Sequence, residues 1–446
     1  MARAPKKIHL AQFLVHGPTY HSHAMWRHPK TREAGFDWRR PELYEHIART
    51  CERGKFDMVF FADLNYISDS FRGTLAPALK YGSQAPEHDP MPLLAWLGAV
   101  TKRVGLASTF SVSNQHPFYA ARMWGTIDHL TAGRAGWNVV SSINHNQAAN
   151  YGTEREPTDR RYERAHEYYQ VCRQLWDSWD EDALVMDPDA PMFADADKVR
   201  RIDFEGEFFR SRGPLNVTPS PQNGPVILQA GTSPRGRDFA AQYAEGIFAI
   251  QPQREEAKKY RHDIRELVAK FGRDPDDCKL LFGAQVVVGS SEQEAQEKMA
   301  EHNELVEPEA GMTILSAHLD FDLSQLPPDS IMEDHEHPAL QRMKTRYRTD
   351  DGRPMTVAEV AQRHGQSVSL PQFAGTPESV TDQLLDFVDH AGGDGFMLSP
   401  IYSPGAIDEF VDLVVPELQN RGRFRKRYTG RTMRGQLREL IDTELF

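Results

Sequence analysis

Short apolar runs alternate with amphipathic stretches along most of this chain. The apolar runs have the length and composition of buried strands, and there are eight: Ile8 to Leu14, Asp57 to Ala62, Val104 to Val112, Ala135 to Val140, Val226 to Ala230, Gly246 to Ile250, Leu280 to Val288 and Gly395 to Leu398. The stretches between them show helical spacing, and several begin with proline or follow Ser, Thr or Asp, as helices do; they cover 41–53, 90–103, 117–130, 160–179, 234–244, 253–271, 292–302 and 377–390. Parallel strands need such crossover helices. The pattern predicts an α/β fold, a (β/α)8 TIM barrel.

An open doubly wound sheet is the alternative architecture. That fold usually carries a glycine-rich GxGxxG turn after its first strand. Here the segment after Leu14 reads Val-His-Gly-Pro-Thr-Tyr-His-Ser-His, which lacks this turn. We therefore favour the barrel.

Three stretches are too long for simple connections. They cover about 64–89, 180–223 and 304–376, are rich in Pro, Asp and Gly, and read as insertions on one barrel domain spanning 1–446, with a tail from about 422 to 446. The third is charged enough to form a mobile lid. A plain solvated excursion explains its composition equally well.

The charge balance argues against a polyanion as partner. The chain has 64 acidic and 52 basic residues, a formal charge of −12, and its one long basic run is Arg421 to Arg427 near the end. We expect a small-molecule ligand, with no nucleic acid and no membrane as partner. The three cysteines are widely separated and the N-terminus makes a poor signal peptide, which favours the reducing cytoplasm.

Polar residues follow several of the predicted strands. A barrel places its chemistry where the strands end. Asp63 closes the second strand, and Thr109 lies in the third. Asn138, Ser141 and Ser142 extend the same rim on the fourth strand, and Gly231 does so on the fifth. For Asp63, a ligand contact and an ordinary helix cap are equally good interpretations.

The segment Thr232-Ser-Pro-Arg-Gly236 opens a helix after the fifth strand. Free backbone N–H groups, the Ser233 hydroxyl and the Arg235 guanidinium could converge there on a phosphate. Tyr162, early in a long helix, could donate its phenol to the same group. A plain serine cap followed by proline is the alternative, and local sequence does not separate the two.

His21 and His23 have the His-x-His spacing with which some barrel hydrolases bind a divalent metal. Such a site needs further histidines and an aspartate at later strand ends, and the fifth and eighth strands end in Leu-Gln-Ala-Gly and Leu-Ser-Pro instead. We therefore predict no metal, and keep a metal-dependent hydrolase as the alternative from another class. The two histidines then serve as catalytic acids or substrate contacts, or lie in a polar surface loop.

Motifs for other chemistries are missing. The chain has no GxSxG elbow, no P-loop and no obvious pair of catalytic carboxylates at neighbouring strand ends. A polar rim with a candidate phosphate site and no nucleophile indicates that a cofactor performs the chemistry.

Five ordered motifs carry a family resemblance over about Ile8 to Arg434. They are Pro117 to Ser142, Ala149-Asn-Tyr-Gly152, Arg161-Tyr-Glu-Arg-Ala165, Leu175-Trp-Asp-Ser-Trp179 and Val226 to Gly236. The chain resembles the nitrilotriacetate and dibenzothiophene-sulfone monooxygenase branch of the bacterial-luciferase-like superfamily.

The resemblance implies a barrel enzyme that takes reduced FMN from a separate NAD(P)H:flavin reductase. It implies reaction of that flavin with dioxygen and oxygenation of a small substrate by the flavin C4a-(hydro)peroxide, in a homodimer or homotetramer. A deazaflavin oxidoreductase and an inactive flavin-binding barrel are the other outcomes within the superfamily. The resemblance favours an organosulfur or heterocyclic substrate, with an aminopolycarboxylate as the alternative, and does not identify the compound. The FMN contacts it implies are Asp63, Thr109, Asn138, Tyr162, Gly231 and Ser233.

One residue departs from the family pattern. Relatives often place a histidine four residues before the tyrosine, near the flavin phosphate, and this chain has Thr158. Threonine carries no charge, so we expect phosphate affinity to depend more on Ser233 and Arg235.

An oxygenating flavin site has to be apolar and closable. Phe60, Phe61, Phe248 and the segment after Glu304 are candidates for that enclosure, and simple barrel core is the alternative for the aromatic rings. By resemblance to the sulfone-oxidising relatives, His21 and His318 are the candidate catalytic residues and His23 a substrate contact.

Overall fold

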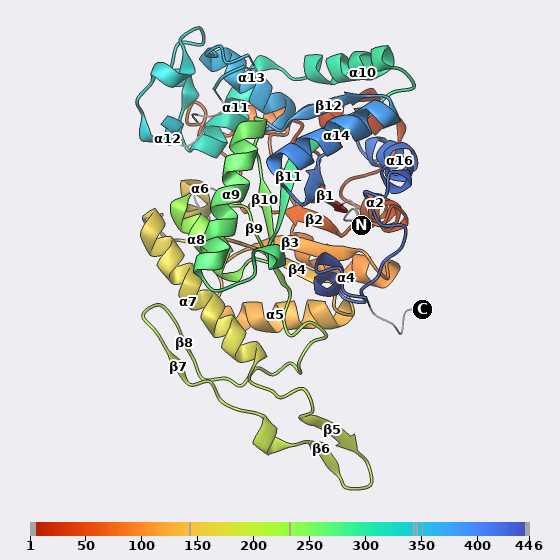
Figure 1. The fold of residues 1–446 in the computed structure, drawn as a ribbon. Helices are drawn as coiled ribbons and strands as arrows, with labels where there is room; N and C mark the ends of the chain where they lie inside the picture. The colour runs from red at the N-terminus through yellow and green to blue at the C-terminus, as the bar shows by residue number, and fades with distance from the viewer. Residues whose placement is uncertain are drawn as a thin grey trace.

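The computed structural model describes residues 6–141, 144–231, 233–341, 344, 347–349 and 351–441. Eight parallel strands close into a barrel in the order β1-β2-β3-β4-β9-β10-β11-β13 and back to β1 (Figure 1). They are β1 (His9–Val15), β2 (Met58–Ala62), β3 (Gly105–Ser111), β4 (Ala135–Val140), β9 (Val226–Gln229), β10 (Gly246–Ala249), β11 (Lys279–Val288) and β13 (Gly395–Leu398). The predicted (β/α)8 barrel is confirmed, and all eight predicted strands lie within one residue of these bounds.

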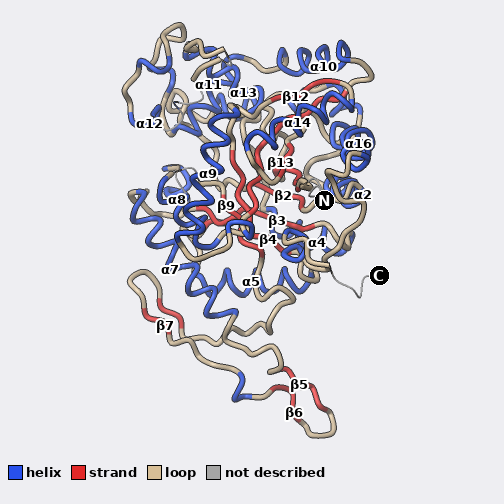
Figure 2. Tube along the Cα trace, in the orientation of Figure 1, coloured by secondary structure: helices blue, strands red, loops and turns tan. Residues whose placement is uncertain are grey.

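Helices surround the barrel, as the tube in Figure 2 shows. Buried apolar residues on their inner faces and on the strands form one large core. The helices that follow the barrel strands are α2 (Pro41–Arg53), α4 (Pro90–Val100), α5 (Pro117–Leu130), α7 (Thr158–Trp176), α8 (Pro234–Tyr243), α9 (Arg254–Lys270), α14 (Pro377–Ala391), α15 (Gly405–Glu409) and α16 (Val415–Asn420). Short helices in the loops are α1 (Pro29–Glu33), α3 (Ala76–Tyr81) and α6 (His145–Asn150).

The helix predicted over 292–302 is present as α10 (Glu292–Glu304), but its expected role as a barrel crossover is wrong. β11 is ten residues long, and only its first half pairs with β10 and β13. Its second half runs beyond the barrel and pairs with β12 (Gln372–Gly375). α10 packs on this extension, because two exposed strands need a cover there.

The segment 304–376 has a hydrophobic cluster of its own. α11 (Pro308–Leu319) packs on α13 (Val357–Ser367), with α12 (Pro338–Gln341) nearby, above the barrel in the view of Figure 1. Ten buried residues, among them Leu315, Met332 and Val360, form that cluster. This segment is a packed unit on the carboxyl side of the strands, rather than a solvated excursion.

The segment 180–223 extends away from the opposite end of the barrel (Figure 1). It contains two small hairpins, β5 (Leu184–Asp187) with β6 (Met192–Ala194) and β7 (Phe204–Glu205) with β8 (Arg210–Ser211). Next to that end, α17 (Met433–Leu437) covers the amino ends of the strands, because Met433 lies against Gly105 and Gly136. The ligand site must therefore lie at the other end.

The basic run near the end of the chain is neutralised by acidic partners. Arg423 pairs with Asp389 at 2.6 Å, Arg421 with Asp382, and Arg425 with the buried Asp57 beneath the barrel. These arginines hold the tail against the barrel.

Candidate functional site

The ends of β3 and β4 are joined by a polar pair. Asn138 and Thr109 are direct neighbours in the sheet register, and the Asn138 amide donates to the Thr109 hydroxyl over 2.9 Å. The amide oxygen of Asn138 is buried and makes no hydrogen bond with the described residues. An orphaned buried acceptor is costly unless a ligand satisfies it. This part of the rim is therefore suited to a ligand with a hydrogen-bond donor.

A second polar group lies where β9 leads into α8. The Ser233 hydroxyl caps α8 by accepting from the Gly236 N–H at 3.1 Å. The Tyr162 hydroxyl lies directly against this turn, because a Cβ added to Gly236 would meet it at 2.7 Å and one added to Gly231 at 3.0 Å. A phenol, two glycines and a helix start form a cradle of the kind that binds phosphate. Thr232 and Ser142 lie outside the described residues.

Arg235 forms an ion pair with an acidic residue early in α7. Its guanidinium is half exposed and donates to Asp159 at 2.9 Å. The sequence reasoning overlooked Arg161, which is buried and donates to the Ser141 carbonyl at 3.2 Å and to the Thr158 hydroxyl at 3.0 Å. The positive charge nearest to the end of β4 therefore comes from Arg161. The signal for it in the sequence was its place in the Arg161-Tyr-Glu-Arg-Ala165 motif, immediately before Tyr162.

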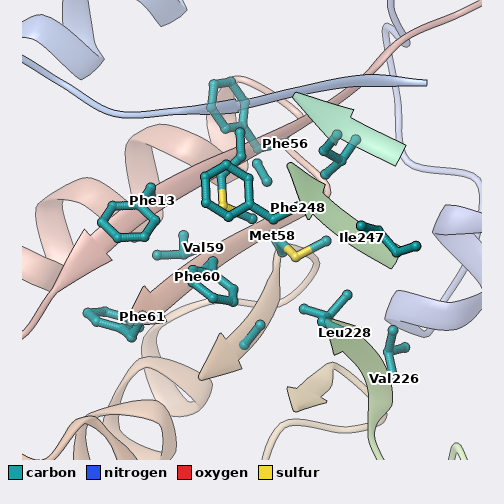
Figure 3. Packing of buried hydrophobic residues seen from close by; sticks show 14 of the residues in the cluster. Phe13, Phe56, Met58, Val59, Phe60, Phe61, Val226, Leu228, Ile247 and Phe248 are labelled. Atoms are coloured by element: carbon teal, nitrogen blue, oxygen red, sulfur yellow. The ribbon is translucent and has the colours of Figure 1, made fainter. Parts of the chain in front are cut away.

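Aromatic rings line the interior of the barrel. The rings of Phe13, Phe60 and Phe248 face one another, with centroid distances from Phe13 of 5.8 Å to Phe60 and 6.1 Å to Phe248 (Figure 3). The expectation that Phe61 lines the pocket is wrong. Successive strand residues point to opposite faces, and the Phe61 ring packs outward against Tyr44 of α2 at 5.8 Å.

Two of the predicted histidines extend this aromatic wall. The His21 ring stacks on Phe13 at 3.7 Å, and both His21 and His23 are buried. Neither His23 ring nitrogen, nor Nδ1 of His21, has a hydrogen-bond partner among the described residues. Burial, followed by the nearby His318, lowers the pKa of His21 well below its ordinary value and that of His23 to about 3. Both rings are therefore neutral at physiological pH.

His318 reaches the same place from the insertion. It stands on α11, near enough to His21 and His23 to influence both. Its ring is bonded on both sides, to His364 of α13 at 2.8 Å and to Gln84 at 2.9 Å. The sequence reasoning did not single out Gln84 or His364, since neither belongs to a local motif.

Asp63 has an acidic neighbour that the sequence reasoning also overlooked. Asp63 accepts from the Asn65 amide at 2.8 Å, and the Glu87 carboxylate accepts from the Leu64 N–H at 3.0 Å. Burial raises the pKa of Asp63 to about 6, and burial together with the Asp63 charge raises the pKa of Glu87. These two carboxyls therefore take up a proton at a higher pH than ordinary carboxyls do.

Metal and membrane features were sought in the part of the chain that the structure describes. No three His, Cys, Asp or Glu side chains gather there as metal ligands. No helix of that part is long and apolar enough to cross a membrane.

The fold and the rim define a (β/α)8-barrel enzyme with a phosphate-type cradle beside an aromatic pocket. A model of the luciferase-like monooxygenase family matches residues 20–395. The chain belongs to this family, and it is a monooxygenase of the branch that includes the dibenzothiophene-sulfone and nitrilotriacetate enzymes.

Three relatives illustrate the match. Dibenzothiophene-sulfone monooxygenase of Rhodococcus erythropolis (strain XP) is 40% identical over 440 residues, 97% of this chain and 96% of the relative. N-acetyl-S-(2-succino)cysteine monooxygenase of Bacillus subtilis (strain 168) is 37% identical, covering 97% of each. Nitrilotriacetate monooxygenase component A of Aminobacter aminovorans is 36% identical, covering 89% of each.

Two solved structures share the whole architecture. DmoA from Hyphomicrobium sulfonivorans superimposes with a TM-score of 0.90 at 34% identity, covering 97% of this chain and 92% of that one. The riboflavin lyase RcaE, solved with modified FMN and riboflavin, superimposes with a TM-score of 0.89 at 30% identity, covering 97% and 96%.

Proposed function

We propose that this chain is the oxygenase component of a two-component, FMN-dependent monooxygenase. It uses reduced FMN and dioxygen to oxygenate a small uncharged organic molecule, an organosulfur or heterocyclic compound. The observation that carries the proposal is the Tyr162 hydroxyl seated against Gly231 and Gly236 at the mouth of a barrel lined with aromatic rings and neutral histidines.

The residues at the mouth fit FMN. The cradle of Tyr162, Ser233 and the two glycines suits the phosphate, since it offers a hydroxyl and backbone donors at a helix start. The unpartnered amide oxygen of Asn138 suits a ring N–H, and Asp63 and Thr109 complete the proposed contacts from neighbouring strands. When bound, reduced FMN supplies the two electrons with which one oxygen atom enters the substrate and the other leaves as water.

The remaining residues exclude water and hold the substrate. Phe13, Phe60 and Phe248 form an apolar wall, and the 304–376 segment brings His318 over the mouth. Enclosure of this kind protects a reactive site from hydrolysis and stray protons. His21 and His23 have unpartnered ring nitrogens, with which they can orient an acceptor group or move a proton.

The neutrality of these histidines favours an uncharged substrate. A buried pocket takes up a carboxylate only when a cation compensates it, and the lowered pKa values of His21 and His23 remove that source of charge. The aminopolycarboxylate alternative is therefore less well supported than the organosulfur one. The name "component A" of the nitrilotriacetate relative supports the two-component part of the proposal.

The test supplies the protein with reduced FMN from an unrelated NADH:flavin reductase under ¹⁸O₂. Candidate substrates are dibenzothiophene sulfone, dimethyl sulfide, an N-heterocycle and nitrilotriacetate, and substrate loss and ¹⁸O in the product are scored by mass spectrometry. NADH consumption is a poor measure, because uncoupled flavin oxidation also consumes it. We expect one ¹⁸O atom in an uncharged product. No affinity for FMN and no ¹⁸O incorporation would contradict the proposal, and oxygenation of nitrilotriacetate alone would contradict its substrate class.

A further inference from the structure

A chain of hydrogen bonds passes through His318 and joins three segments that are distant in sequence. Nε2 of His318 lies 2.9 Å from the amide oxygen of Gln84, and Nδ1 lies 2.8 Å from Nε2 of His364. Nδ1 of His364 in turn lies 3.2 Å from the Ser369 hydroxyl. The two imidazoles stand edge to face, with centroids 5.0 Å apart and an angle of 87° between their planes.

The chemistry of these atoms gives the chain one direction. The Gln84 oxygen only accepts, so Nε2 of His318 carries the hydrogen. In a neutral imidazole the other nitrogen is then an acceptor, and Nδ1 of His318 accepts from Nε2–H of His364. Nδ1 of His364 is left to accept from the Ser369 hydroxyl. One tautomer of each ring satisfies all three bonds.

The residues at both ends of this hydrogen-bond chain have left-handed backbone conformations. Gln84 has φ +51°, and Val368 and Ser369 have φ +53° and +61°. Residues other than glycine rarely adopt this left-handed region, and for a β-branched residue such as Val368 it is an outlier. Strain of this kind persists where the surrounding structure holds it, often at functional sites. Here it brings the Gln84 amide and the Ser369 hydroxyl to the two ends of one chain.

The half of the hydrogen-bond chain formed by His364 and Ser369 is shielded from water. His364 is fully buried and Ser369 is 4% exposed. Water therefore cannot take the place of the Ser369–His364 bond, and the orientation of His364 depends on the protein. His318, which lies between Gln84 and His364 in this chain, is near His21 and His23 at the barrel mouth.

We propose that Gln84, His364 and Ser369 are positioning residues that hold His318 in its Nε2–H tautomer at the mouth of the barrel. The inference rests on the proposed function, in which His318 acts on the substrate. His364 and Ser369 fix the hydrogen on the side of His318 that faces Gln84, and Gln84 holds the ring in place. The three residues act through His318 and do not contact the substrate.

The first test needs no flavin. Histidine labelled with ¹⁵N reports its tautomer through long-range ¹H–¹⁵N correlations, and His318→Gln assigns the signals. We expect Nε2 of His318 to carry the hydrogen in the wild type, a mixture of tautomers in His364→Ala, and recovery in His364→Gln, whose amide can donate to the same nitrogen. A tautomer mixture in the wild type, or an unchanged His318 in His364→Ala, would overturn the proposal.

The second test measures product formed per NADH consumed. We expect this ratio to fall about tenfold in His364→Ala, with a lower kcat for oxygenation and little change in KM. We expect a smaller fall in the ratio in Ser369→Ala and substantial recovery in His364→Gln. His335→Ala is the matched control, since His335 also bonds a serine of the same segment, Ser330, at 2.8 Å, outside the chain. If His364→Ala does not fold, Ser369→Ala provides the same comparison, because it removes the hydroxyl that donates to His364.

The two proposals fail separately. If the tautomer data agree but the wild type oxygenates no substrate, the proposed function is contradicted, whereas the hydrogen-bond chain through His318 is confirmed. If the wild type is active and His364→Ala matches the His335→Ala control in coupling, the positioning role is overturned.

Discussion

The side-chain amide of Asn138 donates to the hydroxyl of Thr109 across neighbouring strands, over 2.9 Å, and leaves its own oxygen buried without a partner. This pair fixes which atom of Asn138 faces the barrel mouth. The amide nitrogen is committed to the protein, and the oxygen is available to a ligand.

Thr109→Val tests this relationship, because valine keeps the shape of threonine and removes the acceptor. Asn138 then loses the bond that orients it, and we expect FMN to bind about fivefold more weakly, the worth of one hydrogen bond. Titration of the protein with FMN, followed by flavin fluorescence, measures the change. Thr126→Val is the control, since the Thr126 hydroxyl donates to the Arg122 carbonyl within α5, away from the proposed FMN contacts. Equal affinities in the two variants would contradict the assignment.

Gly236→Ala tests the phosphate cradle. The new methyl group would lie 2.7 Å from the Tyr162 hydroxyl and fill the space that we assign to the phosphate. We expect about a tenfold loss of FMN affinity, with riboflavin, which has no phosphate, affected much less. Gly125→Ala is the matched control, because Gly125 lies within α5 and its new methyl group would make only an ordinary 3.4 Å contact with the Val217 side chain. Loss of riboflavin and FMN binding to the same degree would show that the cradle holds no phosphate.

Asp63→Asn tests the raised carboxyl pKa. The folded-state pKa of about 6 exceeds the ordinary value of 3.8, so folding favours the protonated form. That stabilisation is complete below about pH 4 and is lost as pH rises through 6. We measure the Tm of the flavin-free variant minus that of the flavin-free wild type. We expect this difference to be about 1–2 °C higher at pH 8 than at pH 4. The matched control is Asp334→Asn, which makes the same chemical change at an exposed position outside the site.

His23→Leu separates a functional from a structural histidine. Both ring nitrogens of His23 are buried without a hydrogen-bond partner among the described residues. Leucine removes these two unsatisfied polar atoms, so we expect Tm to stay equal or rise. We also expect kcat/KM for oxygenation to fall about tenfold or more. His28→Leu provides the contrast, because Nδ1 of His28 caps α1 by accepting from the Lys30 N–H at 3.2 Å, and its loss should lower Tm. A His23→Leu enzyme with unchanged kcat/KM would remove His23 from the site.

Much of the barrel could be predicted because its signal is local. Each strand is a short apolar run and each helix has its own periodicity, so the eight strands from His9 to Leu398 follow from the neighbours of each residue in the sequence. The same holds for Ser233, because a serine followed by proline is a local signal for a helix N-cap. Strand alternation also explains the one error in the aromatic wall, because Phe60 and Phe61 cannot both face inward.

The remaining features depended on tertiary structure. Glu87 near Asp63, Arg161 beside Ser141 and the chain from Gln84 to Ser369 all join residues on separate segments, and no spacing in the sequence records such contacts. Burial decided the charge of His21 and His23, and Asp159 engages the Arg235 guanidinium in an ion pair.

The sequence by itself therefore determined the barrel and the end of it that carries the site, because hydrophobic periodicity and helix starts are properties of neighbouring residues. The tertiary structure alone decided which side chains meet at that end and in which protonation state. Desolvation and hydrogen-bond partners are set by groups brought together from across the chain, and these fix what the His318 and Asn138 side chains can offer a ligand.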